Sequence, residues 1–507
     1  MSHESGTPIV ISDTENAYQT SGQCDCDCDC ACSAFAAPPD TTNNFPARSL
    51  PNELQPLRRS SPSYALKLDN NHSIYYGPRH APVVLNESAA GILAHFDRSP
   101  DLSDFDWQWH EGGEERVVRA VQRLIAANLL VPEGIVAADV SETPTTLSAW
   151  LHVTDRCNLR CAYCYLPHAS VDMTVETGCA AIEATFRSAL IHNYRQVKLK
   201  YAGGEAMLRF QLVAELHRYA RERAGECGLG LDGVALSNGT LLTEEIIEAM
   251  KALGLRLMIS LDGLAEAHDR QRHFADGRAS SAVVTGSVEL ALANGMTPDI
   301  SITVSSRNID GLPELMEWVL ERDLPFSLNF YRENDLSATT ADLRLEEERI
   351  ISGMLAAYKV IEARLPRRSL LASLVDFANL SVPHLRTCSV GQSYLVFDYR
   401  GRVAKCQMQI NKPVTTAYVN DPLADIRADQ FGIQNKSVEE KEGCRSCEWK
   451  YWCTGGCPLT TFRATGRYDV KSPNCNIYKA LYPEAVRLEG LRLLKYRGEL
   501  LPLPLEE

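Results

Sequence analysis

The placement of cysteines constrains this chain more than any other feature. Of its 17 cysteines, five lie in residues 24–32, three in 157–164 and seven in 388–475. The start of the sequence lacks the basic-then-apolar layout of a signal peptide. A reducing cytosol keeps thiols free, so clustered cysteines in such a chain indicate metal ligation or catalysis rather than disulfides. We therefore expect metal centres.

Composition limits the partners of the chain. Its 507 residues, of which 45% are hydrophobic, suffice for two or three domains with buried cores. No uninterrupted apolar run reaches membrane-spanning length, so we expect a cytoplasmic protein with no membrane partner. The formal charge of −14 argues against an extended phosphate-binding surface, and we expect no nucleic-acid partner.

Residues 148–340 alternate strand and helix patterns, which indicates an α/β fold with a parallel sheet wrapped by helices. Six such units predict a partial (β/α)6 barrel, with its chemistry at the carboxyl ends of the strands. The predicted strands are 150–153, 197–201, 233–236, 255–261, 300–304 and 326–330. The predicted helices are 175–190, 209–223, 244–253, 282–293 and 312–322, and residues 341–385 are predicted to form a helical bridge.

Cys157, Cys161 and Cys164 lie within eight residues directly after the first predicted strand. One loop can therefore bind three corners of an iron–sulfur cubane and leave the fourth iron open. This CxxxCxxC loop, with Tyr163 before the last cysteine, resembles the defining motif of the radical S-adenosylmethionine (SAM) superfamily. The resemblance implies that the open iron binds SAM and that Tyr163 belongs to the SAM site. A zinc-binding loop is the alternative.

Three further segments follow the next predicted strands, and each resembles a SAM-pocket segment of the superfamily. They are GGE at 203–205, SNGT at 237–240 and SLDG at 260–263; Ala206 departs from the proline that commonly follows GGE. The resemblance implies SAM contacts by Gly203, Gly204, Glu205, Ser237, Asn238, Ser260 and Asp262, with Ser260 the expected ribose contact. The following stretch, through His268 and Arg272, also resembles the superfamily but has no assigned role.

The seven later cysteines have an ordered spacing that resembles the SPASM domain, a C-terminal extension of radical SAM enzymes with two auxiliary [4Fe–4S] clusters. The resemblance implies an outer cluster bound by Cys444, Cys447, Cys453 and Cys475. It implies an inner cluster bound by Cys388, Cys406 and Cys457. The inner set has three thiolates, since no eighth cysteine lies shortly before Cys388, and a substrate thiolate is a candidate fourth ligand. A structural zinc ribbon of Cys444, Cys447, Cys453 and Cys457 is the alternative.

Residues 63–135 predict a small winged-helix-like module, with Asn86 as the cap of its first helix. The segment VLNESA at 84–89 resembles the peptide recognition element of ribosomal-peptide maturases, in which a leader peptide adds as a strand to the sheet edge. A generic winged-helix appendage is the alternative.

The remaining segments carry fewer signals. Residues 1–62 are predicted to be a largely disordered tail, and residues 386–485 and 486–507 are predicted to be the SPASM domain and a C-terminal tail. For the repeat CDCDCDCAC at 24–32, three interpretations stay open: a metal-collecting tail, a tethered substrate-like segment, or an acidic run without chemistry. The isolated Cys179 and Cys227 fall on or beside predicted helices, which favours structural thiols.

These resemblances together imply a radical SAM peptide maturase with three [4Fe–4S] clusters. It would install a cross-link, preferably a thioether, in a precursor peptide that carries a leader, and it would take electrons from a donor such as flavodoxin or ferredoxin. Alternatives in the same class are a carbon–carbon peptide cyclase, an anaerobic sulfatase-type formylglycine-forming enzyme and a peptide-splicing or epimerising enzyme. A non-catalytic, metal-stabilised binding scaffold is the alternative from a different class.

Overall fold

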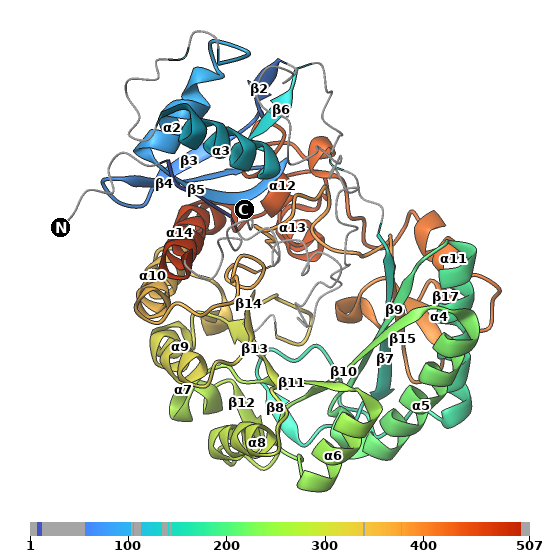
Figure 1. The fold of residues 1–507 in the computed structure, drawn as a ribbon. Coiled ribbons are helices and arrows are strands. Elements are labelled where there is room, and N and C mark those ends of the chain that lie inside the picture. Colours follow the sequence, from blue (N-terminus) through green and yellow to red (C-terminus); the bar gives the residue numbers. More distant parts are fainter. Residues whose placement is uncertain are drawn as a thin grey trace.

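The computed structural model describes residues 8–12, 56–102, 105, 113–133, 140, 144–337, 340–376 and 378–497. Figure 1 shows a large barrel-like part and a smaller N-terminal module beside it. The repeat at 24–32 lies outside the described residues. Within the range predicted to be disordered, two short strands form, β1 (Val10–Ser12) and β2 (Leu57–Arg59). Three residues are too few for a detectable period, and both strands depend on partners distant in the sequence.

A curved, mainly parallel sheet is the scaffold of the large part, and its helices cover the outer face (Figure 1). The strand order is β14-β13-β11-β10-β9-β7-β15-β16-β17, and the first seven of these are parallel. The barrel strands are β7 (Thr146–Thr154), β9 (Gln196–Gly203), β10 (Gly230–Ser237), β11 (Arg256–Ser260), β13 (Asp299–Val304) and β14 (Phe326–Phe330). The outer helices are α4 (Val175–Ile191), α5 (Phe210–Cys227), α6 (Glu244–Leu253), α8 (Ser281–Ala293), α9 (Leu312–Glu321) and α10 (Glu347–Ala363).

The α/β fold class and the partial barrel are confirmed, because each predicted strand and helix of this region forms. Helix α6 illustrates why. The Thr243 hydroxyl accepts a hydrogen bond from the Ile246 backbone N–H at 3.3 Å and caps the first turn. Gly254 ends the helix with a φ of 67°, which glycine adopts without strain. Cys179 and Cys227 lie on α4 and α5, partly buried against the core.

The sheet continues beyond the predicted barrel. Strand β15 (Tyr394–Phe397) pairs in parallel with β7, and β16 (Arg402–Ala404) and β17 (Thr415–Thr416) follow in antiparallel order. The same sheet therefore crosses the boundary predicted at residue 386. All four residues of β15 are buried, since β7 and the barrel core cover them. Four apolar residues in a Cys- and Gly-rich region show no period that predicts this pairing.

The N-terminal module contains a four-stranded antiparallel sheet in the order β1-β5-β4-β3. Its other elements are β3 (Tyr64–Lys67), β4 (His72–Gly77), β5 (His80–Asn86), α2 (Glu87–His95), α3 (Gly113–Ala126) and β6 (Leu130–Pro132), which pairs with β2. The Asn86 side-chain oxygen accepts the Ala89 backbone N–H at 3.0 Å, as predicted for a helix cap. Val83, Leu85, Ile92 and other apolar residues form a separate core under the two helices.

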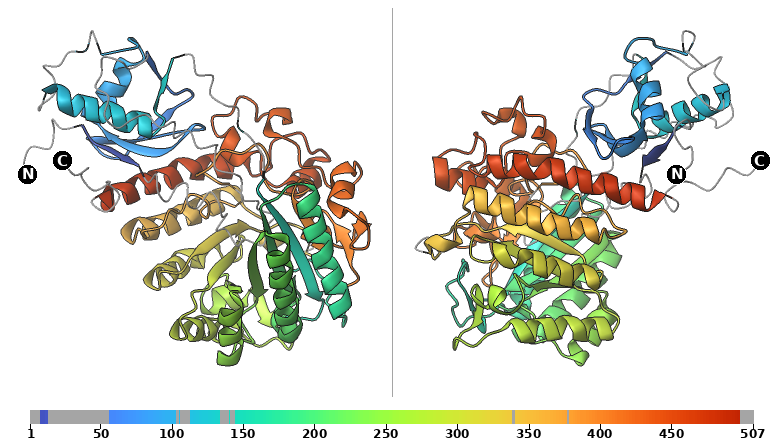
Figure 2. Two further views of the ribbon diagram at one scale, coloured as in Figure 1. Left: turned by 45° about the vertical axis from the view of Figure 1, so that its right-hand side comes forward. Right: turned by 90° about the vertical axis from the view of Figure 1, so that its left-hand side faces the viewer.

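Helix α14 (Cys475–Lys495) joins the two parts of the molecule (Figure 2). It packs against α10 of the barrel and against β1, β3, β4 and β5 of the module. Gly490 permits this approach, because a Cβ atom there would lie 2.7 Å from the Leu68 side chain. The prediction of a separate tail from residue 486 is corrected: residues 486–495 continue this helix, with Leu488 and Leu493 buried.

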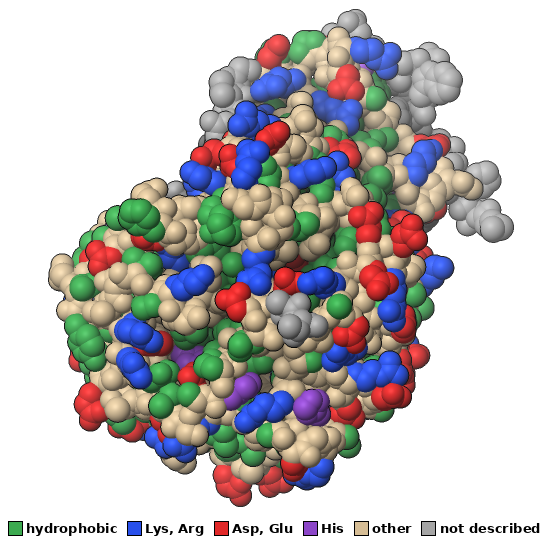
Figure 3. All heavy atoms as spheres, turned by 180° about the vertical axis from the view of Figure 1, so that it is seen from behind, with side chains coloured by type: hydrophobic (Ala, Val, Ile, Leu, Met, Phe, Trp, Pro, Cys, Tyr) green, Lys and Arg blue, Asp and Glu red, His purple; other side chains and the backbone are tan. Residues whose placement is uncertain are grey.

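The charge distribution on one face and the apolar character of the helices can be compared with the expectations about nucleic acid and membranes. On the face shown in Figure 3, basic side chains are interspersed with acidic ones. In the part of the chain that the structure describes, no helix combines the length and apolar character needed to cross a membrane.

Candidate active site

A cavity of about 200 Å³ lies at the carboxyl ends of the barrel strands. Six cysteines line it, in two groups of three: Cys157, Cys161 and Cys164, and Cys388, Cys406 and Cys457. The wall between them includes seven of the eight predicted SAM contacts, namely Tyr163, Gly203, Gly204, Glu205, Ser237, Asn238 and Ser260. The fold therefore gathers residues that are as far as 300 positions apart in the sequence.

Gly203 and Gly204 hold the first cysteine loop against the end of β9. A Cβ atom at Gly203 would lie 2.3 Å from the Thr154 carbonyl oxygen, and one at Gly204 would lie 2.3 Å from that of Arg156. The backbone N–H of Gly204 donates to the Thr154 carbonyl at 2.7 Å, and that of Glu205 donates to the Arg156 carbonyl at 2.8 Å. Any larger residue pushes the loop outward, so the two glycines set the position of the first cysteine.

The Glu205 carboxylate ties together the ends of β9 and β10. It accepts hydrogen bonds from the Ser237 hydroxyl at 2.8 Å, the Asn238 backbone N–H at 2.6 Å and the Met207 backbone N–H at 2.9 Å. Burial raises the pKa of Glu205, while these donors oppose the rise. The Asn238 side-chain amide donates to the Cys157 sulfur at 3.8 Å. These residues thus position the cysteine loop as well as line the cavity.

A two-stranded antiparallel ribbon, β8 (Leu159–Cys161) with β12 (Arg272–Phe274), carries the second cysteine. Its register places Cys161 opposite Arg272, and the Ala162 N–H fixes the ribbon by donating to the Gln271 carbonyl at 2.8 Å. Burial raises the pKa of Cys161, and the Arg272 guanidinium opposes this rise. A buried cation beside the thiol stabilises the thiolate that metal ligation requires.

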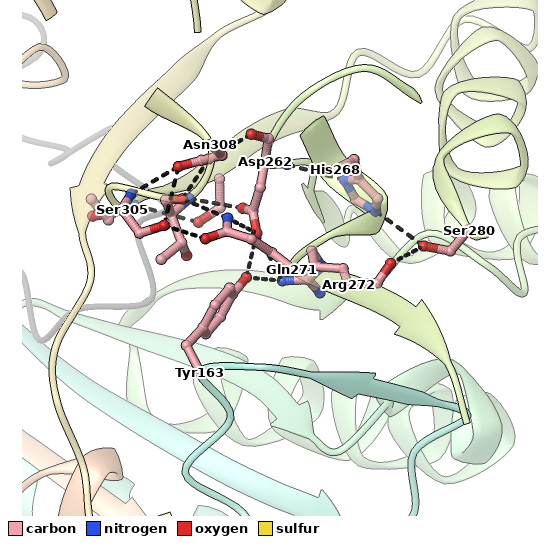
Figure 4. Close-up of polar contacts among 11 residues, drawn as sticks. Tyr163, Asp262, His268, Gln271, Arg272, Ser280, Ser305 and Asn308 are labelled. Carbon is pink, nitrogen blue, oxygen red and sulfur yellow. Dashed lines mark hydrogen bonds and ion pairs between the residues drawn. The ribbon is translucent and has the colours of Figure 1, made fainter. Parts of the chain in front are cut away.

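At the wall of the larger cavity, Tyr163, Asp262 and Arg272 form a polar triangle, in which Asp262 and Arg272 are buried (Figure 4). The Tyr163 hydroxyl donates to Asp262 Oδ2 at 2.6 Å and accepts from the Arg272 guanidinium. Asp262 Oδ1 accepts the Thr303 backbone N–H at 2.8 Å. Unlike the other predicted SAM contacts, Asp262 does not line the cavity. Its carboxylate instead fixes Tyr163 and Arg272, which both do.

His268 supports this triangle as a neutral ring (Figure 4). Its Nδ1 accepts the Asp262 backbone N–H at 3.2 Å, and its Nε2 lies 3.1 Å from the Ser280 hydroxyl. Ser280 in turn donates to the Arg272 carbonyl at 2.6 Å. Burial lowers the pKa of His268 to about 3, so one ring nitrogen accepts and the other donates at neutral pH.

The second cysteine triplet enters the cavity on three C-terminal loops and consists of Cys388, Cys406 and Cys457. The Asn435 side-chain amide donates to the Cys388 sulfur at 3.7 Å. The partly buried Arg332 guanidinium binds Asp376 Oδ1 at 2.6 Å and also interacts with Cys457. Cys457 lies directly before α13 (Pro458–Thr465), at the helix end that favours negative charge. The Asn435 amide and the Arg332 guanidinium thus lie where they favour negative charge on the sulfur atoms.

A second cavity, of about 20 Å³, is lined by all four cysteines of the predicted outer set: Cys444, Cys447, Cys453 and Cys475. Trp449, Tyr478 and Tyr482 also belong to its wall. Cys453 ends α12 (Lys450–Cys453), and Cys475 begins α14. The alternative zinc ribbon needs Cys457, which lines the larger cavity instead. Among the described residues, no three His, Cys, Asp or Glu side chains are arranged to hold a single metal ion.

The thiol chemistry of both cavities fits iron–sulfur ligation. Burial raises the pKa of Cys157 to about 11 and the pKa values of Cys164, Cys406 and Cys453 to about 12. Without a metal these thiols stay protonated at neutral pH, whereas a metal binds them as thiolates. Ligation therefore releases protons. The assignment of individual cysteines to three clusters stays a prediction.

Sequence reasoning missed several polar groups that line the larger cavity, among them His168, Arg272, Asn329 and Arg332. Arg272 lies in the stretch that resembled the superfamily without an assigned role. Asn329 and Arg332 lie at the carboxyl end of β14, where a barrel of this kind carries its chemistry, so strand position was a usable signal.

Comparison with known proteins now adds to this geometry. Residues 151–321 match the family described as the radical SAM superfamily. This segment is a radical SAM domain. It contains the first cysteine loop and all the predicted SAM contacts, and it ends before the two C-terminal cysteine sets. SAM and a [4Fe–4S] cluster are the cofactors of such a domain, and the thiol-lined cavity at its strand ends fits both.

Of three curated relatives that resemble this chain, two match it over only about half of their own length. An uncharacterized protein of Methanocaldococcus jannaschii is 29% identical over 34% of this chain and 57% of its own length. The Fe-coproporphyrin III synthase of Methanosarcina barkeri is 29% identical over 39% of this chain and 48% of its own. The chain thus spans about half the length of these relatives. The AdoMet-dependent heme synthase of Methanosarcina barkeri is 26% identical over 66% of this chain and 96% of its own.

A solved structure shares the fold over most of the chain. Native anSMEcpe with bound AdoMet and Cp18Cys peptide superposes with a TM-score of 0.55 at 18% identity, over 70% of this chain and all of that one. At this identity the similarity establishes the fold alone. The shared fold covers more of the chain than residues 151–321, so it includes regions outside the radical SAM domain as well.

Proposed function

We propose that this chain is a radical SAM enzyme that installs a thioether cross-link in a ribosomally made peptide. The shared cavity carries this proposal, because the first cysteine loop and the second triplet line the same space. A peptide in this cavity lies between the two triplets. The second triplet offers three thiols, so its remaining ligand position is available to a cysteine of the peptide.

The residues of the chain bind, aim and shield the reactants. When bound, SAM and the iron–sulfur clusters supply a 5′-deoxyadenosyl radical and accept the electron that cross-linking releases. Gly203, Gly204 and Glu205 fix the loop, and Asp262 and Arg272 fix Tyr163. Apolar side chains around the cavity, including Trp150, Leu236, Val390 and Ile433, exclude water from reactive intermediates.

Two observations support a peptide as the substrate. The native anSMEcpe structure, which shares the fold, contains a bound Cp18Cys peptide. The N-terminal module has the strand edge and helices that peptide addition needs, and it contains the segment at 84–89 that resembles a recognition element. We further propose that a flavodoxin or ferredoxin supplies the electrons and that all three predicted clusters form.

The test is turnover with a reconstituted enzyme. The reduced protein is incubated with SAM and a candidate precursor peptide, and the products are analysed by mass spectrometry. We expect 5′-deoxyadenosine together with a peptide that has lost two hydrogens and one alkylatable thiol. A control peptide with Cys→Ser at the same position stays unchanged. Loss of two hydrogens with every thiol still free contradicts a thioether and supports a carbon–carbon cyclase. Stoichiometric zinc without SAM cleavage supports a binding scaffold.

Tetrapyrrole chemistry is a second candidate, because two relatives carry the names Fe-coproporphyrin III synthase and AdoMet-dependent heme synthase. The second of these matches along nearly its whole length. In a parallel incubation, iron-coproporphyrin replaces the peptide, and a SAM-dependent change in its mass is followed by mass spectrometry. Product formation there, with no peptide modification, favours this candidate.

A further inference from the structure

The sheet edge of the N-terminal module is occupied by the chain itself. Strand β1 pairs antiparallel with β5, with Val10 opposite Leu85. The Ile9 backbone N–H donates to the Asn86 side-chain oxygen at 2.9 Å, and the Asn86 backbone N–H donates to the Ile9 carbonyl at 3.3 Å. Residues 8–12 thus satisfy backbone groups that an edge strand otherwise leaves unpaired.

β1 lies in a slot that is covered on both faces. It contacts α3 of the module on one side and α14 on the other, and Figure 2 shows it (dark blue) between the module and the red helix α14. Val10 is buried in the core of the module, whereas Ile11 is buried in the larger core that includes α14 and the barrel. Successive strand residues point to opposite faces. The slot therefore accepts consecutive apolar residues, not an alternation of apolar and polar ones.

We propose that this slot is the peptide-binding site of the module and that residues 8–12 occupy it in cis. The inference rests on the proposed function, in which the module binds a peptide strand. The fitting ligand is an extended peptide with consecutive β-branched apolar residues, like the Ile-Val-Ile run at 9–11. β5 is held by β4 on its other side, whereas β1 has β5 as its only neighbour in the described sheet. β1 is therefore the strand that exchanges, and an external peptide enters only when β1 leaves.

The probe is a fluorescein-labelled synthetic peptide with residues 5–16 of this chain. It is titrated, with fluorescence anisotropy as the readout, into the intact protein and into a variant that lacks residues 1–13. A tethered strand acts at an effective concentration on the order of millimolar. For a peptide whose own affinity is on the order of micromolar, we expect about 10²- to 10³-fold tighter binding to the truncated protein. Hydrogen exchange of β5 rises on truncation and falls again when the peptide is added.

Two controls keep the test decisive. A probe with Ile11→Asp does not bind, because the slot buries this side chain. If the truncated chain misfolds, the full-length Val10→Thr/Ile11→Thr variant is used in its place. These substitutions weaken the pairing of β1 alone, so the probe binds this variant more tightly than the unaltered protein, by a smaller factor than expected for the truncated chain. Phe431→Thr, at a fully exposed residue, is its matched control and shows no gain.

The proposal is overturned if the probe binds the intact and truncated proteins equally. It is also overturned if the probe fails to bind a truncated protein that melts cooperatively, since β1 is then a purely structural strand. Neither SAM nor reductant is present in this assay. A failure of peptide modification therefore leaves the binding result intact, and a failure of binding leaves the proposed catalysis intact.

Discussion

The larger cavity holds two triplets of cysteines in about 200 Å³, whereas the smaller holds four cysteines in about 20 Å³. Charged and polar groups, including Glu205, Asn238 and Arg272, line the larger one. Aromatic rings and Lys450, Lys471 and Lys479 surround the smaller one. Four thiols saturate a cubane and three leave an iron open. From the number of thiols and the free volume, we therefore expect the larger cavity to be the reactive site and the smaller one to be a structural site. The following experiments test this difference.

Removal of the first triplet has the largest expected effect. In the Cys157→Ala/Cys161→Ala/Cys164→Ala variant, 5′-deoxyadenosine falls below detection, because the loop no longer binds the cluster that holds SAM. Iron content falls by about four atoms per chain. Chromatography of the nucleoside and iron analysis measure both effects. The control is Cys179→Ala on α4, outside both cavities. Persistent SAM cleavage contradicts the assignment of this triplet.

Substitution in the second triplet is expected to uncouple two activities. Cys388→Ala retains SAM cleavage, because the first loop is intact, but the cross-linked peptide falls below detection. The measurement is the ratio of 5′-deoxyadenosine to modified peptide in one incubation. Cys227→Ala, at the end of α5, is the matched control and keeps the ratio of the unaltered enzyme. A normal yield of peptide from Cys388→Ala shows that this triplet is not part of the reactive site.

Substitution in the smaller cavity is expected to affect stability first. Cys447→Ala removes one of the four predicted ligands, which include Cys453 of α12 and Cys475 of α14, so we expect metal binding to stabilise the packing of these helices less. A loss of about 2–3 kcal/mol lowers the Tm by roughly 2–4 °C in a chain of this size. Thermal unfolding followed by circular dichroism measures this shift. An unchanged Tm together with lost peptide modification assigns a catalytic role to the outer set. The smaller cavity is then not a purely structural site.

The smallest expected effect concerns the polar triangle of Tyr163, Asp262 and Arg272 at the wall of the larger cavity. Tyr163→Phe removes the hydrogen bond of 2.6 Å to Asp262 but keeps the ring in the wall. One hydrogen bond contributes about 1 kcal/mol, which corresponds to roughly fivefold weaker SAM binding. Equilibrium SAM binding tests this, with Tyr219→Phe on α5 as the control. A change of a hundredfold or more indicates that the hydroxyl contacts SAM directly.

The sequence predicted the barrel well because its elements have strong, local signals. The residues of β14 and α6 carry the expected period, and Thr243 and Gly254 mark the helix ends in the sequence itself. The family resemblance of the cysteine motifs implied three sets, and the structure places two of them on the larger cavity and the third on the smaller one.

Non-local pairings were not predictable in the same way. β1 and β15 have three and four residues, and each joins a strand that is distant in the sequence. The position of Asp262 behind Tyr163 depends on a side-chain direction that the motif does not encode. The role of Arg272 depends on the register of the ribbon that pairs it with Cys161.

Helix α14 has a consequence for how the protein is made. Its first residue lines the smaller cavity, and its later turns cover the sheet of the N-terminal module. On the ribosome, the module is synthesised long before this helix. The face of its sheet that α14 covers therefore stays uncovered until the whole barrel has been synthesised. Domains generally fold as units in the order of their synthesis. The contact between α14 and the module, and the completion of the smaller cavity by Cys475, therefore both follow the synthesis of the barrel.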